Sequence, residues 1–215
     1  MDRIKKLCAY LDKCQSFADV GCDHGYCTRF MLENNLCTAA VISDISAKCL
    51  QKAEKLLAPY ISCGKCVSVC CNGLEKIDEA TEQILIAGMG GEEIVQMLSS
   101  AYIPRSFTFQ PMKNVQRVRE YLIENGAEIT VDEPFESGGK FYFVIKGTRN
   151  GNKTNYTKAQ FLFGKNLNGE ATKKYINSEL GKKKSYLLRN LSESERQKIQ
   201  AEINFMKGVL NGETE

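Results

Sequence analysis

The segment FADVGCDHGYCTRF, residues 17–30, combines a short apolar run, a glycine at the end of that run and a segment with helical spacing. Glycine at this position lets the backbone turn tightly and approach a ligand, because it has no Cβ. Two acidic residues, Asp19 and Asp23, flank the turn. These features predict a β-strand, a ligand-binding loop and a helix, in this order.

Further apolar runs follow at residues 40–44, 67–70, 84–88, 106–110, 128–132 and 141–146. Connections long enough for a helix join the earlier runs, which predicts a parallel sheet covered on both faces. Only residues 133–140 separate the last two runs, and this turn-rich connection is too short for a helical crossover. We therefore expect an α/β fold with a Rossmann-like sheet of seven strands, the last of them antiparallel.

Amphipathic helices are expected at both ends of the chain. Residues 2–14 carry apolar side chains at spacings of three and four, which predicts an opening helix packed on the main domain. The polar segment at residues 149–154 is typical of a linker. Beyond it, two helical patterns meet at the capping-box sequence Ser192 to Glu195, which predicts an antiparallel pair. The expected domains are a sheet domain at 1–150 and a coiled-coil-like helical hairpin at 151–215.

The composition is that of an ordinary globular protein, with 43% hydrophobic and 26% charged residues among 215. The longest strongly apolar stretch, ILIAGMGG, is too short to cross a bilayer, and the N-terminus lacks the apolar core of a secretory signal. A cytoplasmic protein without a membrane segment is expected. Its ten cysteines then predict reduced thiols, and no metal is expected, because the CxxC of Cys63 and Cys66 lacks a second spaced pair.

The net charge of +3 is unevenly distributed. Residues 151–215 hold 12 Lys and Arg against 7 Asp and Glu, whereas residues 1–150 hold 17 against 19. A basic helical hairpin on a near-neutral body suits a polyanionic partner. A packing or dimerisation element whose lysines only face water gives the same pattern, so both interpretations stay open.

The first loop differs from the G-x-G-x-x-G pattern that holds a dinucleotide. Asp23 would place a carboxylate beside two phosphates, which would repel it. S-adenosylmethionine instead carries an ammonium and a sulfonium, and an acidic loop attracts both. The loop therefore favours S-adenosylmethionine over NAD as the cofactor. Asp44, at the end of the second strand, is placed either to accept hydrogen bonds from ribose hydroxyls or to cap the following helix.

Other candidate residues also follow strand ends. Residues 88–91, GMGG, suit a loop whose backbone lines a crevice, because ligands bind at the carboxyl ends of strands in open α/β sheets. Gln110 places an amide at the same edge. Residues 72–73 are either an adenine contact or a turn, and Arg117 and Arg119 face either RNA or only solvent.

Four motifs together carry a family resemblance: ADVGCDHGY (18–26), IAGMGG (86–91), FQP (109–111) and GGKFYFVIK (138–146), followed by a helical hairpin. In this order they resemble the bacterial tRNA (adenine-22-N1)-methyltransferase family over essentially the whole chain. The resemblance implies a class I methyltransferase fold, S-adenosylmethionine as cofactor and tRNA as partner. It also implies methylation of N1 of an adenine in the D-arm, at position 22. A monomer is expected.

The resemblance also implies roles for individual residues. The cofactor-binding residues it implies are Asp19, Gly21, Asp23, His24, Tyr26, Asp44, Asn72, Gly73, Gly88 and Met89. The catalytic residues it implies are Gly90, Gln110, Pro111 and Tyr142. The family pattern also carries onto Gly91 and Lys140. His24 is expected to hydrogen-bond within the loop, with general-base catalysis as the alternative.

The chain departs from the family pattern at several positions. Cys22 stands where a serine is usual, Gly25 replaces alanine, Asn72 aspartate, Met112 asparagine and Phe143 glutamate. The residues alone leave two alternatives open. One is a methyltransferase of the same fold acting on another RNA or a small molecule, and the other is a binding protein without turnover.

Overall fold

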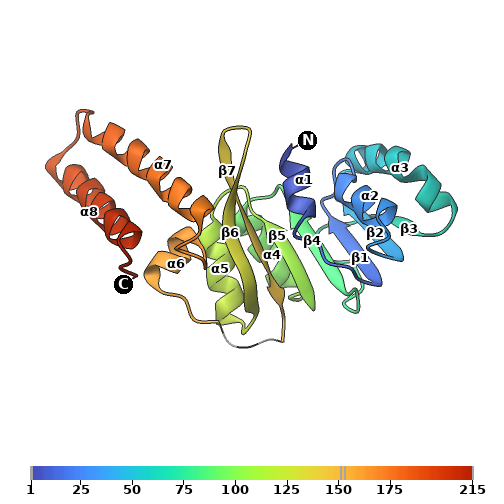
Figure 1. Ribbon diagram of the computed structural model, residues 1–215. Helices are drawn as coiled ribbons and strands as arrows, with labels where there is room; N and C mark the ends of the chain where they lie inside the picture. The colour runs from blue at the N-terminus through green and yellow to red at the C-terminus, as the bar shows by residue number, and fades with distance from the viewer. Residues whose placement is uncertain (1, 151, 153, 215) are drawn as a thin grey trace.

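The computed structural model describes residues 2–150, 152 and 154–214. Its centre is a seven-stranded sheet with the order β3-β2-β1-β4-β5-β7-β6 (Figure 1). The strands are β1 (Ser16–Val20), β2 (Ala39–Asp44), β3 (Cys66–Cys70), β4 (Gln83–Ala87), β5 (Ser106–Gln110), β6 (Glu128–Ser137) and β7 (Lys140–Thr148). The predicted strands and the α/β fold class are confirmed.

The strands β1 to β5 pair in parallel, and β7 is antiparallel to both β5 and β6. The prediction that residues 133–140 form a turn-rich connection is wrong for its first half, because β6 continues to Ser137. Phe135 is buried there and stacks on Tyr142. Pro134 is tolerated because β6 is an edge strand. The turn itself is Gly138–Gly139, where both residues have a positive φ, as two-residue hairpin turns require.

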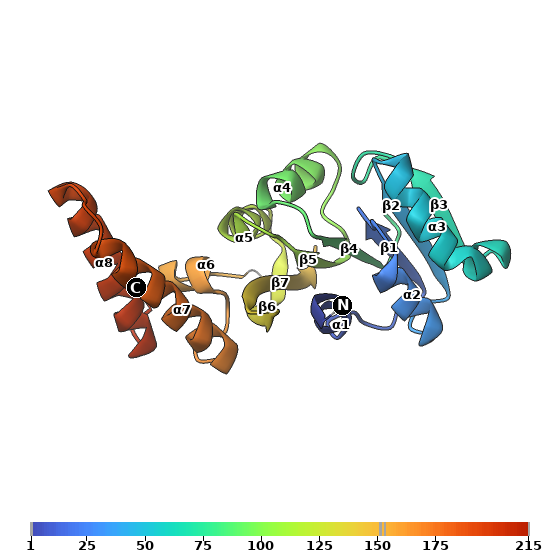
Figure 2. The same cartoon turned by 90° about the horizontal axis from the view of Figure 1, so that it is seen from above.

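Helices cover both faces of the sheet, as Figure 2 shows. One face carries α1 (Asp2–Cys8), α2 (Tyr26–Glu33) and α3 (Ala47–Ser62), and the other carries α4 (Gly91–Ser100) and α5 (Val115–Glu124). The expected opening helix packs on the sheet domain but ends at Cys8 rather than at residue 14. The chain turns there toward β1, and Cys14 N–H bonds the Leu36 carbonyl instead of extending the helix.

Strand β1 shows how the two apolar cores position the site. Phe17 is buried in the core under α1 to α3, whereas Ala18 and Val20 are buried in the core under α4 and α5. Successive side chains of a strand point to opposite faces of the sheet, so Asp19 lies on the same face as Phe17. It is the one charged residue of this strand. The apolar residues around it therefore fix a buried carboxylate at the carboxyl end of β1.

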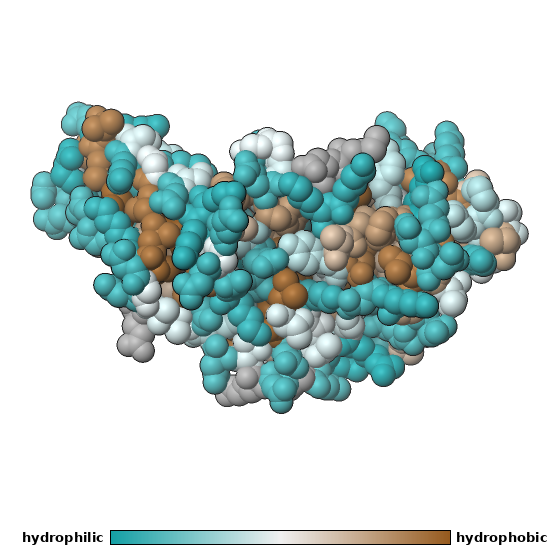
Figure 3. All heavy atoms as spheres, viewed as in Figure 1, coloured by the Kyte–Doolittle hydropathy of each residue, from teal (hydrophilic) through white to brown (hydrophobic). Residues whose placement is uncertain are grey.

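The C-terminal part contains α6 (Lys158–Phe163), α7 (Glu170–Leu187) and α8 (Glu193–Leu210). The predicted hairpin of α7 and α8 is confirmed, and Ser192 and Glu195 form the predicted capping box at the start of α8. Helix α6 was not predicted. The hairpin has its own small core, which joins Phe163 of α6 to Ile176 and Ile203. In Figure 3 an apolar stripe runs along the hairpin within a largely hydrophilic surface.

A buried ion pair of the sheet domain makes further hydrogen bonds that tie this domain to the C-terminal part. The Arg119 guanidinium donates two hydrogen bonds to Asp132 of β6, at 2.7 and 2.8 Å, and a third to the Phe161 carbonyl of α6, at 2.9 Å. Tyr156 donates to the same carboxylate. Arg119 is 1% exposed, so both expected roles, facing RNA or facing solvent, are wrong for it. The arginine packs under α6, which the sequence pattern did not reveal.

None of the helices in the described part of the chain is both long and apolar enough to span a bilayer. The boundary between residues 150 and 151 stays a prediction, and Gly151 and Lys153 of the expected linker lie outside the described residues.

Candidate functional site

The loop after β1 has an unusual backbone. Gly21, Asp23 and Gly25 all have a positive φ, of 71°, 45° and 71°. The loop is held against the end of β2, because the N–H groups of Gly21 and Cys22 both bond to the Ser43 carbonyl. Asp23 is the residue for which this conformation costs most, since it carries a Cβ. Strain of this kind is typical of ligand-binding turns.

Asp19 lies at the base of this loop and is buried. Its carboxylate accepts a hydrogen bond of 2.9 Å from the Thr28 hydroxyl of α2. Desolvation raises the pKa of Asp19 to about 6, although the bond from Thr28 opposes the rise, and the nearby Asp44 adds to it. A buried carboxylate without a cationic partner is costly, and a bound cation would relieve this cost.

Asp23 is exposed at the mouth of the loop. Its carboxylate contacts His24 Nδ1 at 2.7 Å and lies 3.6 Å from Lys52 Nζ. Desolvation is the largest single influence and opposes ionisation, but the contacts with His24 and Lys52 together outweigh it and lower the pKa of Asp23. The His24 ring stacks on Tyr26 at 5.5 Å between centroids. His24 is thus engaged within the loop, as expected; the general-base alternative remains untested.

Asp44 ends β2 beside the same loop. Its carboxylate accepts from the Ser46 N–H at 2.8 Å and from the Asp23 N–H at 3.4 Å. The Ser46 hydroxyl caps α3 by accepting from Cys49 N–H, so the capping role belongs to Ser46. The Asp44 carboxylate therefore faces the loop after β1, which is compatible with the ribose role predicted for it.

The loops after β4 and β5 are joined backbone to backbone. Gly88 N–H bonds the Gln110 carbonyl, Met112 N–H bonds the Met89 carbonyl, and Gly91 N–H bonds the Lys113 carbonyl. A Cβ on Gly91 would lie 2.2 Å from the Asn114 carbonyl oxygen. Close packing of two loops therefore explains Gly91, whereas Gly88 has a φ of 84° and a Cβ on it would meet only the Arg3 guanidinium, at 3.9 Å.

Arg3 of α1 completes this edge, and the sequence reasoning missed it. Its guanidinium donates to the Gln110 amide oxygen at 2.8 Å and to Met112 Sδ at 3.3 Å. It also lies 5.5 Å from the centre of the Tyr142 ring. Helical spacing did not distinguish Arg3 from the lysines beside it, because its partners are more than 100 residues away in the chain.

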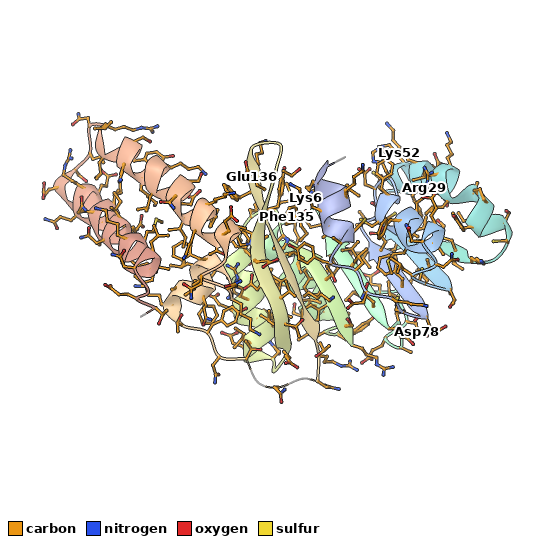
Figure 4. The ribbon with its side chains drawn as sticks, viewed as in Figure 1. Lys6, Arg29, Lys52, Asp78, Phe135 and Glu136 are labelled. Carbon is orange, nitrogen blue, oxygen red and sulfur yellow. The ribbon has the colours of Figure 1, made fainter. Side chains whose placement is uncertain are left out.

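Gln110 is fully buried beneath this arginine. Its amide nitrogen bonds the Pro111 carbonyl at 3.1 Å. Helix α1 is in turn held to the β6–β7 hairpin, where Lys6 donates to the Glu136 carbonyl, and Figure 4 shows Lys6 beside Phe135 and Glu136. The open edge therefore presents Arg3, while Gln110 supports it from below.

Two cavities follow the carboxyl edge of the sheet. One, of about 180 Å³, is lined by Arg3, Asp19, Asp23 and Tyr26, among others. The other, of about 50 Å³, is lined by Asp44, residues 71–73 and Met97, among others. Gly21 lines both, and the Met89 methyl group lies against it: a Cβ on Gly21 would be 1.9 Å from Met89 Cε. The two cavities therefore meet at Gly21, where the Met89 side chain lies, and are together called the crevice below.

The smaller cavity contains the predicted adenine-contact residues. Gly73 has a φ of 54° and packs against Met97, and the Asn72 side chain bonds Glu75 at 3.3 Å. The neighbouring cysteines are all free thiols. In the described part of the chain, no group of three or more His, Cys, Asp or Glu side chains is arranged to hold a metal ion.

Similarity to known proteins indicates the family to which this chain belongs. Residues 1–145 match the family model described as "Methyltransferase domain". The chain belongs to the methyltransferase domain family. A Mycoplasma pneumoniae protein named "Putative tRNA methyltransferase" is 32% identical over 157 residues, which cover 72% of this chain and 74% of the relative.

Solved structures share the fold of this methyltransferase along nearly its whole length. The structure of M. capricolum TrmK with S-adenosyl-homocysteine has a TM-score of 0.86 at 20% identity and covers 98% of this chain and 97% of its own. The B. subtilis M1A22 tRNA methyltransferase TrmK has a TM-score of 0.82 at 21% identity, with 97% of each chain covered. The methyltransferase fold observed here therefore includes the C-terminal helices.

The predicted site residues of this methyltransferase meet along one edge. The predicted residues in the loops after β1 to β4 line the two cavities or are next in sequence to residues that line them. The predicted residues in the loop after β5 and in β7 lie around Arg3. Lys140 stands apart, beside the β6–β7 turn. The individual roles assigned to these residues remain predictions.

Proposed function

We propose that this methyltransferase uses S-adenosylmethionine to methylate N1 of an adenine in tRNA, at position 22 as in the M1A22 relative. The observation that carries the proposal is the acidic crevice at the carboxyl edge of the sheet, with Asp19 buried at its base. S-adenosylmethionine supplies a methyl group on a cationic sulfur. The two carboxylates and one arginine of the crevice complement the two positive charges and one carboxylate of S-adenosylmethionine, whereas the carboxylates would repel a diphosphate.

The residues present fit such a donor. Asp19 and Asp23 attract the ammonium and sulfonium charges, and Arg3 lies in the same cavity as the cation for the donor carboxylate. Asp44 accepts from the ribose hydroxyls, and residues 72–73 border the adenine. The donor spans the two cavities only when the Met89 side chain turns away from Gly21.

Adenine N1 has a lone pair and no proton, so the reaction needs no strong general base before attack. Positioning and electrostatic accommodation of the charge that moves to the base supply most of the rate. In this proposal Gly90, Pro111 and Tyr142 place the adenine, and Gln110 acts through Arg3, which it holds. Because N1 lies on the Watson–Crick edge, the target base has to be unpaired or flipped outward.

The helical hairpin contributes phosphate contacts in this proposal, since it carries most of the basic excess of the chain. A tRNA substrate also implies action in the cytoplasm. We expect a monomer, because one chain already supplies the crevice and the basic hairpin.

Transfer of a labelled methyl group to unmodified tRNA, with the product nucleoside mapped, tests the proposal. The expected product is 1-methyladenosine at position 22, and a tRNA with guanine at that position should remain unlabelled. Equal labelling of both tRNAs would indicate another target position. No labelling of any tRNA by a protein that binds the donor would favour another substrate or a binding role.

A further inference from the structure

A second, larger cleft lies beyond the loop after β5. It has a volume of about 540 Å³ and is lined by Pro111, Met112, the start of α5, the start of β7 and parts of α6 and α7. None of its lining residues lines either part of the donor crevice. The cleft nevertheless lies beside the crevice, because the N–H of Met112, which lines the cleft, bonds the carbonyl of Met89, which lines the smaller cavity.

Aromatic rings form one wall of this cleft. Phe141 and Phe143 lie on the same face of β7, and both meet the Tyr175 ring of α7 edge-on, at 5.5 and 4.9 Å between centroids. Burial raises the pKa of Tyr175 to about 12, so its hydroxyl stays protonated. No hydrogen bond joins this hydroxyl to another group in the described part of the chain, so a donor is left for a ligand.

Arg119 packs against this aromatic wall and supports it. The Arg119 guanidinium lies 4.7 Å from the centre of the Phe143 ring, and its ion pair with Asp132 is buried. The aromatic surface is thus supported by the joint between the sheet domain and the C-terminal part. A preformed aromatic surface of this kind suits stacking with a nucleobase, because every base has a π-face.

Lys113 stands at the boundary between crevice and cleft. Its aliphatic stem lies over Gly90, since a Cβ there would be 2.7 Å from Lys113 Cε, and it also lines the cleft. Its ammonium forms no ion pair with any described residue, whereas the neighbouring Arg117 contacts both Glu92 and Glu120. An exposed unpaired cation between two binding sites suits a phosphate that links their occupants.

From this arrangement we infer that the cleft binds the nucleotide next to the methylated adenosine in the RNA substrate. The neighbouring base lies against Phe141 and Tyr175, and the Lys113 ammonium contacts the phosphate that joins the two nucleotides. This inference rests on the proposed function, because it requires an RNA acceptor. Pro111 and Tyr142, which place the target adenine in the proposed function, line the edge of the cleft, so its far wall of Phe141 and Tyr175 is left for the adjacent base.

The direct test uses wild-type protein and short RNA hairpins that carry the target adenine. An abasic residue replaces either the 5′ or the 3′ neighbour of the target, and KM for the RNA is measured for each. One of the two abasic RNAs is expected to show a KM roughly 5- to 150-fold higher, the range of a lost base–aromatic stack. Unchanged KM values for both would overturn the inference.

Variants then locate the contact. Phe141→Ala should raise KM for the intact RNA and leave it almost unchanged for the sensitive abasic RNA, because the stack is already absent. Tyr175→Phe keeps the packing and removes only the hydroxyl donor, so it should also raise KM for the intact RNA and leave KM for the sensitive abasic RNA almost unchanged, even should Phe141→Ala loosen the fold. An equal increase in KM for the intact and the abasic RNA would show that the neighbouring base does not contact Phe141.

The phosphate contact has a matched control. Lys113→Met keeps the stem and should lower the slope of log affinity against log salt by about 0.7, the value for one single-strand phosphate. Lys55→Met removes an exposed cation of α3, far from the cleft, and should leave the slope unchanged. An unchanged slope in Lys113→Met would overturn the assignment. Failure of the proposed function is recognised separately, since the wild type would then methylate no RNA.

Discussion

The crevice at the carboxyl edge of the sheet and the helical hairpin differ in how their residues are constrained. In the crevice, Gly21, Asp23, Gly73 and Gly88 all have a positive φ, and a carboxylate is buried at its base. In the described residues 165–211 of the hairpin segment, no residue has a positive φ. The crevice thus contains two costly features, the strained backbone of Asp23 and the buried carboxylate of Asp19, whereas helix packing and solubility account for the hairpin.

This difference explains why the crevice can be assigned a ligand more readily than the hairpin. Strain and buried charge cost of order 1–3 kcal/mol each, so they persist where function requires them. Exposed lysines on a helix cost almost nothing and persist without any function. Substitution of Arg119, which connects the two regions, should have the largest effect, and substitutions within either region alone should have smaller effects.

The largest effect is expected at the joint. Arg119→Ala leaves the Asp132 carboxylate buried without its partner and should lower the free energy of unfolding by about 3–5 kcal/mol. Chemical denaturation measures this change. Arg117→Ala, two residues away on the same helix, removes only exposed ion pairs and should leave the midpoint unchanged. Equal midpoints for both variants would show that Arg119, with its ion pair and its bond to Phe161, does not stabilise the fold.

The second-largest effect is expected in the crevice. Gly21→Ala adds a methyl group in the space that Met89 now fills, between the two cavities that a donor would span. Its affinity for S-adenosylmethionine should fall by at least about 100-fold, which corresponds to about 2.7 kcal/mol. Calorimetric titration measures it.

Gly64→Ala is the matched control for backbone strain. Gly64 has a φ of 75°, close to the 71° of Gly21, but a Cβ there meets nothing within 4 Å. Both variants lose stability through strain, and only Gly21→Ala should lose donor affinity. A loss of affinity in both would assign the effect to strain rather than to the crevice.

A smaller effect follows from the raised pKa of Asp19, which lies at about 6. The protonated form prevails in the free protein below this pH, and a donor ammonium binds only the ionised form. Affinity should therefore fall up to about tenfold per pH unit below pH 6. Asp19→Asn should bind weakly, with a flat profile over the same range. A flat profile in the wild type would separate Asp19 from donor binding.

The stability of the free protein should change in the opposite direction. Because the folded-state pKa of Asp19 is raised, the folded protein retains its proton longer than the unfolded chain, and stability falls as pH rises from about 4 to 6. Asp19→Asn removes this loss, so its advantage over the wild type should grow across that range. Denaturation at pH 4 and at pH 7 checks the sign.

The smallest effect is expected on the hairpin. Lys173→Gln with Lys184→Gln removes two exposed cations of α7 and should weaken tRNA binding several-fold. The slope of log affinity against log salt should fall by about 1.4 to 1.8 if both contact phosphates. Lys55→Gln with Lys65→Gln is the control on the sheet domain. Equal slopes for the two double variants would leave the hairpin as a packing element.

The sequence predicted those features that local patterns determine. The strands, the antiparallel β7 and the Ser192 capping box follow from apolar periodicity and cap chemistry, and the crevice loops follow from glycines at strand ends. Arg3 and Arg119 were missed or misplaced, because their partners are distant in the chain. Helix α6 is only six residues long and too short for a periodic signal. The extension of β6 was missed because residues 133–140 together are rich in turn-forming residues, and the edge position of β6 is what makes Pro134 acceptable in a strand.

Calorimetric titration of the wild-type protein with S-adenosylmethionine and with NAD tests most directly whether the acidic crevice holds a cationic sulfur compound. Saturable one-to-one binding of S-adenosylmethionine, lost in Gly21→Ala, with no heat from NAD, is the predicted result. Binding of NAD, or S-adenosylmethionine binding that Gly21→Ala leaves intact, would contradict it.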